Sequence, residues 1–330
     1  EPILDAGLRA EINLPFDCRN GGCGLCKCTV LNGKVDPGVY QPSALSPAER
    51  AQGKVLMCCA TPLSDIEIEY EPQFALTRAA VKEYVGTVAR MERLTHDVMG
   101  VVVKLPEGQS VPFTAGQYIN IILDDGERRA FSFASAPHMA HDIELQIRLM
   151  PGGRFTTHVF EKMKVGDAIR FEGPLGDFVL RESNRPILFV AGATGFAPVK
   201  SMVEDAFHRG LHRPIHLYWG VRRPEDLYLV GLPEQWAREH ATFKFVPVLS
   251  EPRPEDNWSG RIGLVHEAIL QDFPSLAGNE IYACGSVRMV EAVFPKLKGQ
   301  GAEEGMCFSD AFTISARSMA IQVPAEEPKS

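Results

Sequence analysis

Cysteines near the beginning of the chain stand at a spacing that few folds can accommodate. Cys18, Cys23 and Cys26 form a C-x4-C-x2-C run, and a fourth cysteine, Cys58 or its neighbour Cys59, follows later. This spacing is typical of a plant-type [2Fe–2S] cluster, whose four thiolate ligands converge on two irons. Glycines between the cysteines allow the loop to turn its backbone amides toward the sulfurs. The spacing therefore predicts a small first domain built around a [2Fe–2S] cluster.

Zinc is the main alternative metal that clustered cysteines bind. Zinc sites usually pair one C-x2-C with a second, or with histidines at matched spacing, and neither pattern accompanies these cysteines. A non-catalytic zinc-binding adaptor is thus the alternative from another class of protein.

The amino-acid composition narrows the possible classes of protein. Six of the eight cysteines fall in the first 60 residues, whereas a secreted disulfide framework would normally occupy a small whole domain. We therefore expect a reducing, cytoplasmic location. A formal charge of −8 argues against a nucleic-acid partner. The apolar runs are shorter than the roughly 20 residues of a membrane span, so none is expected.

The pattern of apolar residues predicts three domains, 1–73, 80–182 and 183–330. The first ends after an alternating run, 66–70, that indicates a half-buried strand. In the second, six short strands separated by turn residues predict a six-stranded antiparallel β-barrel. In the third, apolar strands alternate with helices, which indicates a doubly wound parallel sheet. The chain is thus expected to combine α+β and α/β domains.

The individual elements follow from the same pattern. The predicted barrel strands are 85–91, 98–105, 118–123, 130–135, 143–149 and 168–172. The predicted strands of the third domain are 187–191, 215–219, 243–249 and 281–283, with helices at 198–209, 264–272 and 287–297.

A short motif on a predicted barrel strand suggests a flavin. Arg129-Ala130-Phe131-Ser132 resembles the R-x-Y-S motif of the ferredoxin–NADP reductase family, with phenylalanine in place of tyrosine. The resemblance implies that Arg129 neutralises the FAD pyrophosphate and that Phe131 covers the isoalloxazine ring. It also implies that the Ser132 hydroxyl bonds to N5, the atom that accepts hydride.

Two further segments resemble that family in the same order along the chain. Pro151-Gly152-Gly153-Arg154-Phe155-Thr156 precedes a predicted helix, and in the family Gly152, Gly153 and Thr156 would bind pyrophosphate at the helix N-terminus. Gly173-Pro174-Leu175-Gly176 matches the turn that closes the barrel.

The third domain carries motifs for nicotinamide. Gly192-Ala193-Thr194-Gly195-Phe196-Ala197-Pro198 resembles the family's G-G-T-G-x-A-P loop, so Gly192, Thr194 and Gly195 are candidate NAD(P)H-binding residues. Cys284 and Gly285 resemble the family's C-G pair, whose cysteine lies near nicotinamide C4. We therefore name Ser132, Thr194 and Cys284 as candidate catalytic residues.

An aromatic ring near the C-terminus is the last element of the resemblance. Phe308 is the candidate that would lie against the flavin, with Phe312 or simple core packing of either ring as alternatives. Coenzyme choice rests on the segment after residue 221. There Arg222 and Arg223 suit a 2′-phosphate and the following acidic residues suit free ribose hydroxyls. We expect NADH, with NADPH as the alternative.

The resemblance also bears on the first domain. In the family's β-grasp ferredoxin domains the fourth ligand stands four residues before a proline, which favours Cys58 before Pro62 and leaves Cys28 and Cys59 as packed thiols. These domains usually open with a β-hairpin, which is absent here, so we expect a truncated form with an exposed sheet edge.

Nearly the whole chain resembles the reductases that serve bacterial oxygenases and the CDP-6-deoxy-glucoseen reductases. The resemblance implies that hydride passes from NADH to FAD and that single electrons then pass through the [2Fe–2S] cluster to a protein partner. The partner would be an oxygenase component or a deoxysugar dehydratase. A stand-alone flavin or ferric reductase is the alternative enzyme.

Overall fold

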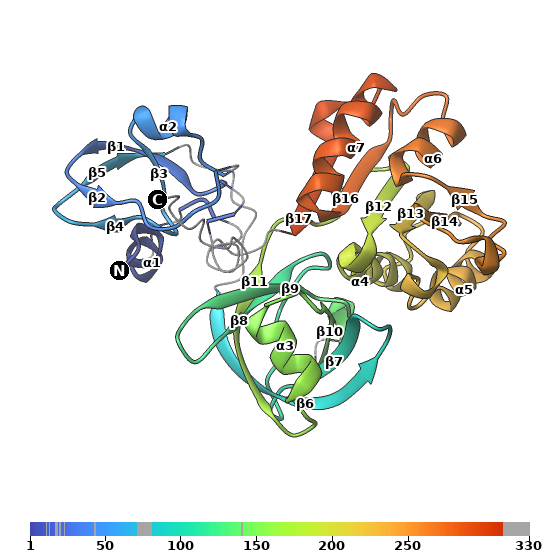
Figure 1. Cartoon of the computed structure of the whole chain (residues 1–330), viewed down its shortest axis with the longest axis horizontal. Coiled ribbons are helices and arrows are strands. Elements are labelled where there is room, and N and C mark those ends of the chain that lie inside the picture. The colour runs from blue at the N-terminus through green and yellow to red at the C-terminus, as the bar shows by residue number, and fades with distance from the viewer. Residues whose placement is uncertain are drawn as a thin grey trace, which may run out of the picture.

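The computed structural model describes residues 1–10, 12, 14–16, 19, 21–22, 24–42, 44–70, 81–139 and 141–312, without the side chain of Leu8. Figure 1 shows three parts in chain order: a small N-terminal part, a barrel, and a layered part with helices on both sides of a sheet. No helix among these residues is both long and apolar enough to cross a membrane.

The N-terminal part consists of short elements around a small apolar core. Its strands form a three-stranded antiparallel sheet in the order β3-β1-β5 and a two-stranded sheet of β2 and β4. The fully buried side chains Leu4, Leu45, Leu56 and Met57 fill the space between the sheet and the helices. Its elements are α1 (Ile3–Arg9), β1 (Lys27–Asn32), β2 (Val35–Asp36), α2 (Pro47–Ala51), β3 (Lys54–Leu56), β4 (Thr61–Pro62) and β5 (Glu67–Glu69).

The middle part confirms the predicted six-stranded antiparallel sheet. Its strands follow the order β10-β7-β6-β11-β8-β9, and the Ala134 amide donates to the Glu144 carbonyl at 2.8 Å, which closes the sheet between its two edges. Alternating apolar side chains point into this barrel. The elements are β6 (Lys82–Arg93), β7 (Val98–Lys104), β8 (Tyr118–Ile122), β9 (Arg128–Ser132), β10 (Asp142–Arg148), α3 (Arg154–Glu161) and β11 (Ala168–Leu175).

The last part confirms the doubly wound parallel sheet. Its strand order is β15-β14-β13-β12-β16-β17, so the chain reverses direction across the sheet between β12 and β16. Such a switch point opens a crevice at the carboxyl ends of the strands, where ligands bind in this class of fold. The elements are β12 (Ile187–Gly192), α4 (Phe196–His208), β13 (Ile215–Val221), α5 (Gly231–Glu239), β14 (Phe243–Leu249), β15 (Arg261–Ile262), α6 (Val265–Asp272), β16 (Glu280–Ser286), α7 (Val287–Gly299) and β17 (Cys307–Phe312).

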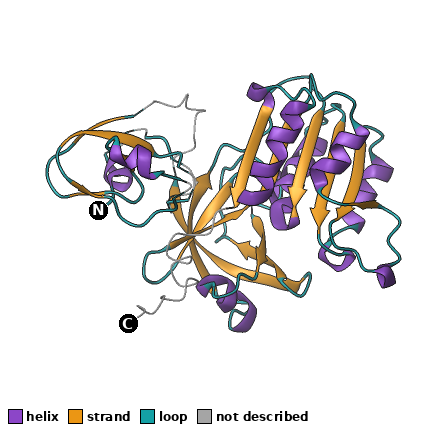
Figure 2. Cartoon of the chain, turned by 45° about the horizontal axis from the view of Figure 1, so that its top comes forward, coloured by secondary structure: helices purple, strands orange, loops and turns teal. Residues whose placement is uncertain are grey.

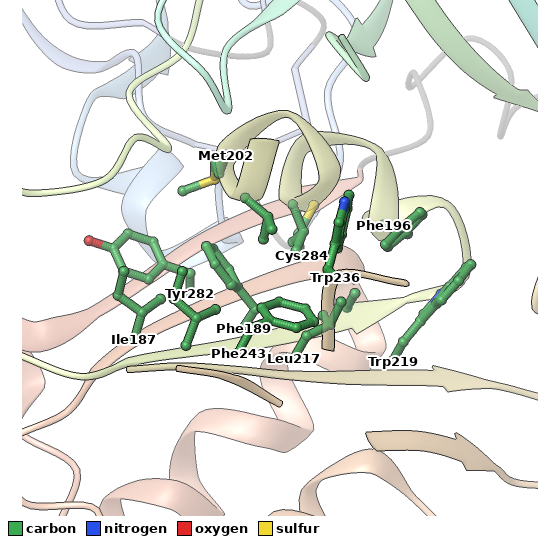
Figure 3. Close-up of a cluster of buried hydrophobic side chains, with 14 of the residues drawn as sticks. Ile187, Phe189, Phe196, Met202, Leu217, Trp219, Trp236, Phe243, Tyr282 and Cys284 are labelled. Atoms are coloured by element: carbon green, nitrogen blue, oxygen red, sulfur yellow. The ribbon is translucent and has the colours of Figure 1, made fainter. Parts of the chain in front are cut away.

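Helices cover both faces of this sheet (Figure 2). One face packs against α4 and α5 through side chains such as Phe196, Trp219 and Trp236, and part of this cluster is drawn in Figure 3. The other face packs against α6 and α7. Short 3-10 turns occur at η1 (Pro137–Met139), η2 (Ala193–Gly195), η3 (Pro224–Asp226), η4 (Pro254–Asp256) and η5 (Glu304–Met306).

Candidate functional site

A cavity of about 550 Å³ lies between the barrel and the carboxyl ends of the parallel strands. It is the place where the predicted flavin motif and the predicted nicotinamide loop face one another. The predicted residues that line it are Arg129, Phe131, Ser132, Gly153, Thr156, Gly192 and Thr194.

Strand β9 presents the flavin motif to the cavity. Ser132 is 7% exposed and pairs with Tyr118 across β8 and β9, so its position is set by the barrel sheet. Phe131 lies against Phe155 of α3, with ring centroids 5.4 Å apart. The strand therefore offers one aromatic face and one hydroxyl to the same space.

The guanidinium of Arg129 has an acidic partner of its own. Its Nη2 lies 2.5 Å from Oε2 of Glu127, and the Arg154 guanidinium lies 3.7 Å from the same oxygen. Two arginines thus converge at this end of the cavity, of which the sequence motif identified only the first. An anionic ligand here would have to share them with Glu127.

Glycine is required at the start of α3. Gly152 has φ +72°, a left-handed conformation that favours glycine. A Cβ on Gly153 would lie 2.5 Å from the Thr156 hydroxyl oxygen, which itself bonds back to the Met150 backbone. Gly153 and Thr156 line the cavity, whereas Gly152 lies in the adjoining turn and does not.

The nicotinamide loop is built on close backbone contacts. A Cβ on Gly195 would lie 2.1 Å from the Cys284 carbonyl oxygen, and one on Gly285 would lie 3.1 Å from that of Gly192. These glycines hold the loop after β12 against the loop after β16, while Thr194 faces the cavity. Ala193 replaces the family's second glycine and still takes φ +47°, with its carbonyl accepting a bond from Trp219 at 2.9 Å.

Cys284 does not line the cavity. The thiol is fully buried in the core on the α4 side of the sheet (Figure 3). Its Sγ lies 3.9 Å from Oδ2 of Asp310 on β17. Burial raises the pKa of the Cys284 thiol, and the neighbouring carboxylate of Asp310 raises it further.

Asp310 is the functional candidate that sequence reasoning missed. Its carboxylate accepts a hydrogen bond from the Ser132 hydroxyl, so it connects the flavin strand to Cys284. Burial raises the pKa of Asp310 to about 6, against the opposing effect of the hydrogen bonds from Ser132 and Cys284. In the sequence, the one indication of its role is that this carboxylate stands between Phe308 and Phe312, the two candidate flavin-contacting rings.

The two C-terminal phenylalanines have different surroundings. Phe308 stacks on Tyr282 at 4.9 Å between ring centroids and contacts the Arg181 guanidinium, and it is not among the cavity residues. Phe312 does line the cavity. Both rings lie on the same face of β17, because they stand four positions apart, but Phe312 stands about 13 Å further along, at the carboxyl end of the strand where the cavity lies. Phe312, the alternative to Phe308, is therefore the ring within reach of a flavin in this cavity.

The segment after β13 offers both kinds of ribose contact. Arg222 and Asp226 line the cavity, whereas Arg223 lies 4.0 Å from Glu225 in an exposed ion pair. Asp226 also accepts a hydrogen bond from the Arg223 amide at 3.0 Å, which holds its carboxylate in place.

Two of the predicted cluster ligands can be located. The sulfurs of Cys26 and Cys58 lie 3.3 Å apart, and that of Cys59 lies 3.6 Å from Cys58. Burial raises the pKa of Cys28 to about 12, with a further contribution from Cys26, as expected for a packed thiol.

The other two predicted ligands, Cys18 and Cys23, lie outside the described residues. The loop around them takes left-handed turns at Gly21 (φ +73°) and Gly24 (φ +77°). Converging cysteine sulfurs on a glycine-rich loop fit a thiolate-bound cluster.

Comparisons with known proteins agree with this arrangement. A family described as "2Fe-2S iron-sulfur cluster binding domain" matches residues 1–63. An "Oxidoreductase FAD-binding domain" matches residues 86–180, and an "Oxidoreductase NAD-binding domain" matches residues 189–294.

Several relatives match over almost their whole length. The chain is 37% identical to the CDP-6-deoxy-L-threo-D-glycero-4-hexulose-3-dehydrase reductase of Yersinia pestis, over 95% of this chain and 93% of the relative. It is also 37% identical to the reductase component of phenol 2-monooxygenase from a Pseudomonas species, over 96% and 90%. Among solved structures, the Amycolatopsis cytochrome P450 reductase superposes with a TM-score of 0.84 at 33% identity, over 96% of this chain and 95% of that one.

These matches exclude a zinc-binding adaptor, because all three domains are of oxidoreductase or [2Fe–2S] type. The chain belongs to the ferredoxin–NADP reductase-type family whose members carry a [2Fe–2S] domain, and it is an oxidoreductase that transfers electrons from NADH through FAD and the [2Fe–2S] cluster to a partner.

Proposed function

We propose that this chain is the reductase component of a two-protein system, and that its partner is an oxygenase component or a deoxysugar dehydratase. The observation that carries the proposal is the similarity, over nearly the whole chain, to a hexulose-dehydrase reductase and to the reductase component of a phenol monooxygenase. The cavity in which Ser132 of the barrel and Thr194 of the parallel sheet face one another supports the hydride-transfer half of the reaction. When bound, FAD supplies the conversion of a hydride into single electrons and the cluster carries those electrons onward.

In this proposal, Ser132 of β9 takes part in hydride transfer, whereas Arg129 of the same strand takes part in binding FAD. Ser132 would donate its hydroxyl hydrogen bond to flavin N5, where electron density arrives during hydride transfer. Arg129 and Arg154 would neutralise the pyrophosphate, whose charge does not change in the reaction. Phe131 would cover one face of the isoalloxazine ring, and Phe312 lies in the same cavity at the sheet side.

Asp310 lies beside Ser132 and accepts the single proton of its hydroxyl. Donation to flavin N5 would therefore require this proton to turn from Asp310 to the flavin, with Asp310 as the alternative acceptor. Cys284 would act through Asp310 and through its backbone, which abuts Gly195 of the nicotinamide loop. We assign Cys284 a positioning role on this ground.

Two features support the remaining parts of the proposal. Asp226 faces the cavity with its carboxylate held in place, which suits the free ribose hydroxyls of NADH. The clustering of six of the eight cysteines in the first 60 residues suits the reducing environment of the cytoplasm.

Reconstitution tests the partner. The purified chain, with NADH, would be combined separately with an oxygenase component and with a deoxysugar dehydratase, and NADH oxidation coupled to product would be measured. Coupled turnover with one of them identifies the class of partner. NADH oxidation that depends only on free flavin or ferric iron, with neither protein accelerating it, would favour a stand-alone reductase instead.

A further inference from the structure

A buried network of charges joins the loop of cluster cysteines to the barrel. Glu172 on β11 is 4% exposed, and its Oε1 accepts a hydrogen bond from Arg19 Nη1 at 2.7 Å. Arg19 directly follows Cys18 in the C-x4-C-x2-C run, and its other terminal nitrogen pairs with Asp5 of α1. The N-terminal part and the barrel are therefore connected by an ion pair that is largely shielded from water.

The same oxygen of Glu172 gathers donors from two barrel strands. Arg128 Nε of β9 donates to it at 2.9 Å, and Asn120 Nδ2 of β8 donates at 3.1 Å. A carboxylate can only accept, so the Asn120 amide must turn its NH₂ group toward Glu172. The buried Oδ1 of Asn120 then accepts no bond from the part of the chain that the structure describes. The amide of Asn120 is thus oriented toward Glu172, although an unmade buried hydrogen bond is costly.

Glu172 balances more positive charge than any other residue of this network. Two arginines, Arg19 and Arg128, meet at its carboxylate. Without that negative charge, the two guanidinium groups would face one another across the junction, and breaking a buried pair in this way is strongly unfavourable. Without Arg19, in contrast, Glu172 keeps its partners within the barrel.

The junction lies beside the proposed flavin site. Tyr118 and Leu175 of the barrel belong to the same apolar cluster as Cys26 and its neighbours in the N-terminal part. Tyr118 is also the cross-strand partner of Ser132. The contact between Glu172 and Arg19 therefore lies between the strand of the flavin motif and the loop of the cluster cysteines.

We propose that Glu172 and Arg19 form a clasp that fixes the cluster domain against the barrel in the orientation used for flavin-to-cluster electron transfer, with Glu172 as a positioning residue. This inference rests on the proposed function, because it assumes that electrons pass from FAD to the cluster. The clasp accounts for an arginine within the ligand loop that makes its buried contact in another domain.

The test uses the holoprotein in three variants. Glu172→Gln and Arg19→Gln remove the clasp from its two sides, and Glu83→Gln removes a carboxylate from an exposed ion pair with Arg170 on the same sheet. Iron and FAD content are measured first. Anaerobic stopped-flow mixing with NADH then resolves flavin reduction from cluster reduction by absorbance, and the cluster potential and solution X-ray scattering are measured on the same samples.

We expect both clasp variants to reduce the flavin at the parental rate and the cluster about tenfold or more slowly, because loss of a buried pair shifts the docking equilibrium by at least that factor. Their radius of gyration should increase while the cluster potential stays unchanged, and Glu83→Gln should match the parent throughout.

The proposal is overturned if either clasp variant reduces its cluster at the parental rate, or if flavin reduction slows by the same factor. It is also overturned if the scattering of both variants matches that of Glu83→Gln, or if a changed potential accounts for the slower rate. Failure of the proposed function would be visible separately, as absence of cluster reduction by NADH in the unmodified chain.

Discussion

Replacing Asp310 by asparagine should stabilise the nicotinamide domain at neutral pH. Burial raises the pKa of Asp310 from 3.8 to about 6. The folded state therefore holds this proton more tightly than the unfolded state, and the group lowers stability as pH rises from about 4 to about 6. A shift of roughly two pKa units corresponds to at most about 3 kcal/mol at pH 8. Asparagine keeps an oxygen that can accept from Ser132 but carries no charge, so the cost disappears.

Tryptophan fluorescence provides the assay, because all three tryptophans, Trp219, Trp236 and Trp258, lie in the third domain. At pH 8 the unfolding midpoint of Asp310→Asn should exceed that of the parent by roughly 6–12 °C, the range expected when about 3 kcal/mol is gained in a domain of this size. Below about pH 4, where Asp310 is protonated in both states, the two midpoints should converge. A variant that is no more stable than the parent at pH 8, or equally stabilised at both pH values, would refute the reasoning.

The remaining predictions concern the candidate cofactor residues. Ser132→Ala should slow flavin reduction at saturating NADH by a factor that corresponds to about 2.7–4 kcal/mol, with little loss of FAD. Arg129→Ala should mainly reduce FAD content. Stopped-flow rates and FAD content measured on both variants test these roles, and a parental rate of flavin reduction in Ser132→Ala would contradict the role of Ser132. Cys58→Ser should abolish the cluster and Cys59→Ser should spare it, as judged by iron content; the reverse result moves the ligand by one residue. Gly195→Ala should weaken NADH binding and lower stability by about 1–3 kcal/mol, because its Cβ would lie 2.1 Å from a carbonyl oxygen; titration with NAD⁺ and thermal unfolding test this, and an unchanged variant would show that the two loops can separate freely.

The architecture could be predicted where one physical rule dominates. Strands such as β7 (Val98–Lys104) alternate between barrel interior and solvent, so the sequence carries their period directly. Helix α5 (Gly231–Glu239) carries no clear helix pattern, because a glycine and a proline so close together are typical of a turn, although proline is tolerated in the first turn of a helix. Burial of Trp236 against the sheet stabilises the segment as a helix. Strand β17 (Cys307–Phe312) includes Ser309 and Asp310, and aspartate is depleted in strands, so its composition does not indicate one.

The site could be predicted only in part, for a related reason. Motifs identify residues that contact a ligand, and Ser132 and Thr194 indeed face one cavity. They do not identify residues that act on other residues across domain boundaries. Asp310 meets Ser132 only after the barrel and the parallel sheet pack together, and the pair of Arg19 and Glu172 is separated by 153 positions in the sequence. Such contacts have no local pattern.

Anaerobic titration of the purified chain with NADH, followed by visible absorbance, tests the central claim most directly. The unreduced protein should show overlapping flavin and [2Fe–2S] bands, and NADH should bleach both, since electrons that enter at the flavin are expected to continue to the cluster. A protein whose flavin is reduced while its cluster stays oxidised would contradict the proposed order of electron transfer.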